Sequence, residues 1–135
     1  MIPYLSYLKI PYKHMGYDYS GADCYGLLYL FYRDELGITL PLPDFEYAKD
    51  WWKSDNHIIG LHKEYSFRLC SEPPAKGDVI LFKNTSSTAG HIGIALDDSS
   101  FMHMAQSGCA VTTYTYGVWH RQIHSVYRHI NRDGQ

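Results

Sequence analysis

Residues 19–41, YSGADCYGLLYLFYRDELGITLP, hold the pattern that most constrains how this chain can fold. Apolar residues recur there mostly at helical spacing, which predicts one helix over 23–36. Gly37 stands where the residue after a helix belongs, and a proline follows soon after it. Asp23 or Ser20 can cap the start of this helix by accepting backbone N–H bonds.

Cys24 falls in the first turn of the predicted helix. A thiol there faces unpaired N–H groups and the positive end of the helix dipole, which predicts a pKa below the roughly 8.5 of a free thiol. Because the thiolate is the nucleophile, Cys24 is a candidate for covalent catalysis. Free cysteine is also a common small buried side chain, so the helix alone does not decide between these interpretations.

After the helix the hydrophobic period changes to two, which indicates strands. The predicted strands cover 77–82, 91–96, 101–105, 109–116 and 125–130, with a tight turn at 97–100 between the second and the third. A second helix is predicted over 44–59, before the strands begin. Helices followed by an antiparallel sheet predict an α+β fold, and 135 residues predict one domain over 1–135.

Three polar residues meet in this predicted arrangement. Within HIGIALDD, His91 shares a face with Gly93 and Ala95, and these small residues are expected to let the helix that carries Cys24 pack against that face. His103 lies on the neighbouring predicted strand. Cys24, His91 and His103 then correspond to a nucleophile, a base and an orienting group.

Two simpler interpretations compete with this one. A histidine on a strand is more often structural than catalytic. Cys24, His91 and His103 are also three side chains that zinc accepts as ligands, with one position left open.

Composition excludes several classes of function. The net charge of −2 and the pI near 6.4 provide no basic surface for nucleic acid. The three cysteines form no CxxC pair, which argues against a disulfide framework and a cysteine-rich metal site, and no cofactor is predicted. No apolar run reaches the length of a membrane span and no signal-peptide pattern precedes the domain, so we expect synthesis in the cytoplasm without a cleaved signal and no membrane insertion.

Three segments carry a resemblance to a known family: PYKHMGYDYSGADCYGLL, GDVILF and GHIGIALDDSSFMHMA. In this order and spacing they resemble the NlpC-type peptidoglycan peptidases, which have a papain-like fold with the nucleophilic cysteine at a helix N-terminus. The resemblance covers residues 11–31 and 77–105, and the last predicted strand also fits. It implies a cysteine endopeptidase that hydrolyses stem-peptide amide bonds of the cell wall, at the γ-D-glutamyl bond to a diamino acid.

The resemblance also assigns roles. It implies that Cys24 is the nucleophile, His91 the base and His103 the third polar residue. The Cys24 N–H and the Tyr12 hydroxyl are the implied oxyanion donors. Asp23 matches the aspartate of the family's Asp-Cys pair. The resemblance implies two roles for it: with Tyr12 it contributes to oxyanion and substrate binding, and it stabilises the start of the helix.

Two departures and one branch assignment accompany the resemblance. Tyr25 replaces the serine that usually follows the cysteine, and residues 44–75 form a longer insert than many members of the family carry. DCYGL with LGI-x-LP resembles the branch found in tails of long-tailed bacteriophages, which implies delivery by the virion tail and tail proteins as partners, with Trp51 and Trp52 as a candidate docking surface. The alternatives are a structural tail-tip assembly protein with a vestigial peptidase site, and an amidase or acyltransferase on the same fold.

Overall fold

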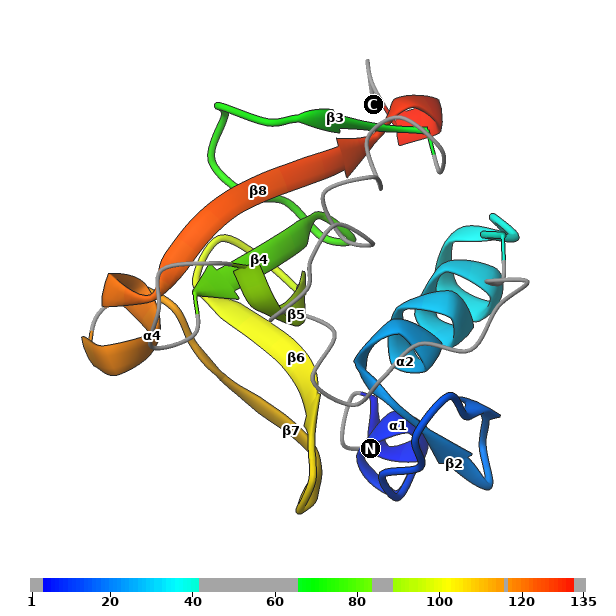
Figure 1. The fold of residues 1–135 in the computed structure, drawn as a ribbon. Helices are drawn as coiled ribbons and strands as arrows, with labels where there is room; N and C mark the ends of the chain where they lie inside the picture. The colour runs from blue at the N-terminus through cyan, green and yellow to red at the C-terminus, as the bar shows by residue number, and fades with distance from the viewer. Residues whose placement is uncertain (1–3, 42–65, 84–88, 116, 133–135) are drawn as a thin grey trace.

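The computed structural model describes residues 4–41, 66–83, 89–115 and 117–132 (Figure 1). Helices come first and an antiparallel sheet follows, which confirms the predicted α+β class. The helix predicted over 44–59 lies outside the described residues, as do Trp51 and Trp52.

The predicted helix forms and ends where the sequence indicates. Asp23 is its N-cap, and α2 spans Cys24–Phe31. A π-helical turn, Tyr32–Leu36, continues α2 without a break. Gly37 ends it with φ 69°, a left-handed conformation that glycine adopts without strain. The helix predicted over 23–36 is therefore confirmed, while its π-helical turn was not predicted.

Short elements surround the start of α2. A helical turn, α1 (Leu5–Leu8), packs against β7, and two short strands, β1 (Tyr17–Asp18) and β2 (Gly21–Ala22), pair just before α2. A Cβ built on Gly26 would lie 1.8 Å from the carbonyl oxygen of Gly16. The loop before α2 therefore lies directly on the first turn of the helix, an approach that only glycine permits there.

Six strands form one sheet in the order β3-β8-β4-β5-β6-β7, with antiparallel pairing throughout. They are β3 (Phe67–Leu69), β4 (Val79–Lys83), β5 (Ala89–Ala95), β6 (Ser100–Ala105), β7 (Gly108–Thr113) and β8 (Ile123–His129). All five predicted strands are confirmed with small shifts of their ends. The last strand, β8, lies between β3 and β4, which local patterns do not predict. A short helix, α4 (Gly117–Arg121), and a 3-10 turn, η3 (Ile130–Arg132), were also not predicted.

Side chains that follow one another along a strand point to opposite faces of the sheet, and an apolar cluster covers each face. On the helix side, Ile92 and Ile94 of β5 pack in one cluster with Leu27 and Leu28 of α2. The opposite face carries a cluster that we call the aromatic cluster. It consists of Ile80, Phe82, Ala95, Phe101 and Tyr114, with Trp119, Ile123 and Val126 packed against it.

This arrangement corrects one prediction about β5. We expected α2 to pack on the face with Gly93 and Ala95, but Ala95 belongs to the aromatic cluster on the opposite face. A Cβ on Gly93 would lie 2.7 Å from the ring of Phe101 and 2.8 Å from that of Phe82. The small residues therefore make room for aromatic rings, and the larger Ile92 and Ile94 contact the helix.

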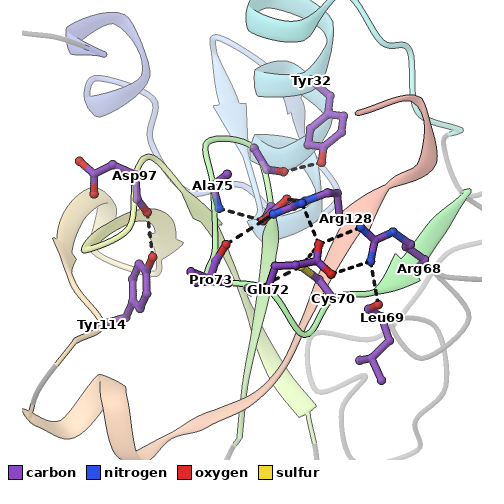
Figure 2. A network of polar contacts seen from close by, with 12 residues as sticks. Tyr32, Arg68, Leu69, Cys70, Glu72, Pro73, Ala75, Asp97, Tyr114 and Arg128 are labelled. Atoms are coloured by element: carbon purple, nitrogen blue, oxygen red, sulfur yellow. Dashed lines mark hydrogen bonds and ion pairs between the residues drawn. The ribbon is translucent and has the colours of Figure 1, made fainter. Parts of the chain in front are cut away.

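An ion-pair network that is buried at Asp78 and exposed at Glu72 joins the start of β4 to β8 (Figure 2). Asp78, just before β4, is fully buried and binds Arg128 of β8 twice, at 3.0 and 2.9 Å. It also accepts the N–H of Ala75 at 2.8 Å. Glu72 bridges Arg128 and Arg68, at 2.9 and 3.0 Å. The network ties the last strand to the start of the sheet.

Replacing Arg128 is expected to destabilise the fold. Arg128→Met leaves the Asp78 carboxylate buried without its partner, which costs about 3 kcal/mol of the free energy of unfolding. Urea unfolding measures this loss. Arg33→Met is the matched control because Arg33 forms an exposed ion pair with Asp34, and such pairs contribute little. Equal unfolding midpoints for the two variants would contradict the structural role of Arg128.

Candidate active site

Cys24 is the first residue of α2, and its side chain is half-buried. The backbone N–H groups of Ile92, Tyr25 and Cys24 itself face the sulfur. Because Ile92 follows His91, this contact places the predicted nucleophile beside the peptide bond that joins His91 to Ile92. The contact depends on the packing of α2 against β5 and β6.

His91 and His103 form a hydrogen-bonded pair across two strands. Antiparallel pairing sets His103 of β6 opposite Gly93 of β5, two residues from His91. Nε2 of His91 lies 2.8 Å from Nδ1 of His103. When Nε2 of His91 is the donor in this bond, its Nδ1 carries no proton and is free to accept one. The contact is the one expected between a base and an orienting group, and the two roles stay predictions.

The charge state of the site differs from the prediction. Burial raises the pKa of the Cys24 thiol to about 12, and the negative charge of Asp23 adds to the rise. Burial, and after it the electrostatic effect of His103, lower the pKa of His91 to about 4. The lowered thiol pKa expected from the helix N-terminus is therefore wrong, because desolvation outweighs the helix dipole. In the resting site both groups are neutral.

Asp23 has the contacts of a helix cap. One of its carboxylate oxygens accepts the N–H of Gly26 at 2.8 Å, and the other accepts the N–H of Met15 at 2.9 Å. The side chain is buried, with 4% of its surface exposed. An ionised carboxylate cannot donate to an oxyanion. Its contacts match the helix-stabilising part of the prediction, and they also hold the loop at Met15 onto the helix start.

Tyr12 lies next to the nucleophile through backbone pairing. It forms a parallel bridge with Ala22, two residues before Cys24, and the N–H of Lys13 donates to the Ala22 carbonyl at 3.1 Å. Burial raises the pKa of the Tyr12 hydroxyl, and the negative charge of Asp23 also raises it. The hydroxyl is thus protonated near neutral pH and within electrostatic range of the sulfur, as a donor to an oxyanion must be.

Tyr25, the departure from the family pattern, has a structural role. Its side chain is buried, and its hydroxyl donates to the carbonyl oxygen of Pro41. It therefore fastens the segment that follows the helix to the helix start. The larger side chain is accommodated without displacing Cys24 from the first turn.

Trp119 is a neighbour of both histidines that sequence reasoning missed. Its ring centroid lies 4.9 Å from that of His103 and 5.8 Å from that of His91. A single tryptophan within the polar run GVWHRQ has no periodic signal, so only the fold shows this contact.

Two other classes of site find no support in the described parts of the chain. No group of three or more His, Cys, Asp or Glu side chains there has an arrangement that could hold a metal ion, so the geometry does not favour the zinc interpretation. Within the same residues, no helix combines the length and apolar character needed to cross a bilayer.

Two known proteins are similar to most of this chain. The tail tip assembly protein K of Escherichia phage N15 is 26% identical over 124 residues, which are 90% of this chain and 50% of that protein. The murein DD-endopeptidase/LD-carboxypeptidase MepS of Escherichia coli is 23% identical over 133 residues, which are 98% of this chain and 62% of that enzyme. The chain thus spans between half and two thirds of the length of these relatives.

Solved structures show the same fold. A Bacillus cereus NlpC/P60 family protein matches with a TM-score of 0.64 at 20% identity, over 92% of this chain and 37% of that one. A lipoprotein-like NLP/P60 family protein of Staphylococcus aureus matches with a TM-score of 0.63 at 23% identity, over 92% of this chain and 38% of that one. The sequence model of the NlpC/P60 family covers residues 9–128, and the chain therefore belongs to the NlpC/P60 family.

Proposed function

We propose that this chain is a cysteine endopeptidase that hydrolyses stem-peptide amide bonds of peptidoglycan. The observation that carries the proposal is the 2.8 Å hydrogen bond between His91 and His103, on strands packed against the helix that begins with Cys24. Family membership and a relative named as a murein endopeptidase supply the substrate class.

The geometry suggests a two-step reaction. Nδ1 of His91 takes the thiol proton as the sulfur of Cys24 attacks the amide carbonyl, and the tetrahedral oxyanion accepts hydrogen bonds from the Cys24 N–H and the Tyr12 hydroxyl. The imidazolium then protonates the leaving amine, and a thioester remains on Cys24. His91 next takes a proton from water, which attacks the thioester carbonyl. The carbon–sulfur bond breaks, the new carboxyl end is released, and the imidazolium returns its proton to the sulfur of Cys24. His103 holds the His91 ring in one tautomer throughout.

Fragments released from purified sacculi test the proposal and identify the bond. We propose cleavage between D-glutamate, through its γ-carboxyl, and the diamino acid. Mass spectrometry of the released fragments would then show chains that begin with a free diamino-acid amine. The relative MepS is named for DD- and LD-bonds, and release of fragments cut only at a bond other than the one to D-glutamate would show a different specificity. No release of any fragment would contradict the enzymatic function.

The neutral resting site predicts a broad pH profile. His91 acts as a base only when unprotonated, and its lowered pKa means that protonation occurs only as the pH falls through about 4. Because the thiol keeps its proton until far above neutrality, kcat/KM should be level from about pH 5 to about pH 8. Turnover of a soluble stem peptide across this range is the measurement. Half-loss of kcat/KM near pH 6.5, the ordinary pKa of histidine, would contradict the assignment.

The phage relative favours a place in a virion tail. A protein named for tail-tip assembly shares 26% identity over 90% of this chain. We propose that the chain reaches the cell wall as a tail component made in the host cytoplasm, with tail proteins as partners. A second candidate function is structural, in which the chain supports assembly without turnover. Tails that incorporate the chain but release no wall fragments would favour the structural role.

A further inference from the structure

The short helix α4 presents a single side chain to the interior of the protein. Gly117, Val118, His120 and Arg121 are exposed, whereas Trp119 is half-buried. A helix of this length is not stabilised by its backbone hydrogen bonds alone. The contacts of this indole, together with a 3.1 Å hydrogen bond between Nδ1 of His120 and the carbonyl oxygen of Tyr114, hold α4 beside the sheet (Figure 1).

The Trp119 ring packs against both histidines and two phenylalanines. Its plane makes an angle of 31° with that of His91 and 62° with that of His103. Its centroid lies 5.0 Å from Phe82 and 5.3 Å from Phe101, both in edge contact. Phe101 in turn lies 5.0 Å from His103. Aromatic rings surround the bond between the two imidazoles at distances where they attract one another.

We propose that Trp119 is a positioning residue, which covers the hydrogen bond between His91 and His103 and holds the two imidazole planes in their working orientation. This inference rests on the proposed peptidase function of the same site. Trp119 acts through the base and its partner and touches no reacting atom.

The physical reason is exclusion of water. Water competes for either nitrogen of an N–H···N bond between neutral imidazoles, and apolar rings around that bond remove the competition and lower the local dielectric. The same cover disfavours the imidazolium form. The pKa values of His91 and His103 are both lowered by burial, in agreement with such a cover.

The described groups that face His91 carry no charge in the resting site. β6 presents the neutral His103, β4 presents the phenyl ring of Phe82, and α4 presents the indole of Trp119. The charge of Asp23 acts on the Cys24 thiol, and both its oxygens accept backbone N–H groups. Substitution of Trp119 therefore changes the cover and leaves the charges of the site as they are.

Titration of the histidine rings by NMR tests the inference without relying on activity. A Cys24→Ala background removes the thiol, so the signals report the histidine pair alone. In this parent the pair should take up its first proton near pH 4. Trp119→Ala should raise the pKa of this first protonation by at least about one unit, toward the pKa of about 6.5 of an exposed histidine, because water then reaches the imidazole rings. Trp119→Phe keeps a ring in place and should restore the parent value. Val118→Ala is the matched control from the same helix, since Val118 is 62% exposed.

Kinetics with Cys24 present supply the second readout. At pH 6, Trp119→Ala should lose roughly 10- to 100-fold in kcat/KM through misplaced imidazoles, and Trp119→Phe should recover most of it. If circular dichroism shows that Trp119→Ala does not fold, Trp119→Leu takes its place, and the pKa of its histidine pair should still be higher than in Trp119→Phe. The inference is overturned if the histidine pair has the same pKa in the variant without an aromatic ring as in Val118→Ala. Failure of the proposed function shows separately, as equal turnover with and without Cys24.

Discussion

A Cys24→Ala variant is expected to lose at least about 10⁴-fold in kcat for the release of stem-peptide fragments. Without the sulfur no thioester can form, and the histidine pair has no nucleophile to deprotonate. Turnover of a soluble stem peptide, followed by mass spectrometry, measures the loss. Alanine should fold normally at this position because the Asp23 cap and the Gly26 contact do not involve the thiol.

Cys109→Ala is the matched control for this loss. Cys109 is a half-buried thiol on β7 whose pKa burial raises to about 12, as at Cys24. It lies opposite Met104 in the sheet. Its removal should leave turnover unchanged. Equal activity of the Cys24→Ala variant and the unaltered chain would remove cysteine catalysis from the proposal, and loss of activity on Cys109→Ala alone would point to the wrong thiol.

The two histidines should separate by role. His91→Ala removes the base and should approach the Cys24→Ala background, since general base catalysis contributes about 10²–10⁴ in rate. His103→Asn and His103→Gln keep a hydrogen-bonding group for Nε2 of His91 and should retain measurable turnover. His103→Ala should fall between these, because it removes the orienting group and leaves the base. The measurement is kcat/KM of each variant on the same soluble peptide.

Folding must be checked for these variants because His103 is only 7% exposed and packs among aromatic rings. Circular dichroism and the urea midpoint provide that check. An active His91→Ala together with an inactive, folded His103→Asn would show that the two roles are reversed.

Local patterns in the sequence were sufficient for much of the framework. The helix that starts at Asp23 follows from its apolar spacing and its caps, and Gly37 ends it in the expected left-handed conformation. The strands follow from alternation, and the pairing of β5 with β6 follows from the tight turn between them. Because a turn between adjacent strands sets the register, the proximity of His91 and His103 could be predicted.

The prediction for the face of β5 failed for a physical reason. Alternation assigns Gly93 and Ala95 to one face and Ile92 and Ile94 to the other, but it does not state which face the helix covers. Small residues accommodate whatever bulky group is opposite, and here that group is a set of aromatic rings, including Phe101. Only the packing of distant segments settles such a choice.

The sequence by itself determined the helix that carries Cys24, the antiparallel strands that carry His91 and His103, and the family pattern that these segments share. All of these depend on contacts between residues close in the chain, or on residue types at fixed spacing. The tertiary structure alone decided the insertion of β8 between β3 and β4, the cover of the histidine pair by Trp119, and the neutral state of Cys24. Each of these depends on segments far apart in the chain, which exclude water when they pack together, and desolvation then outweighs the local effect of the helix dipole on the thiol.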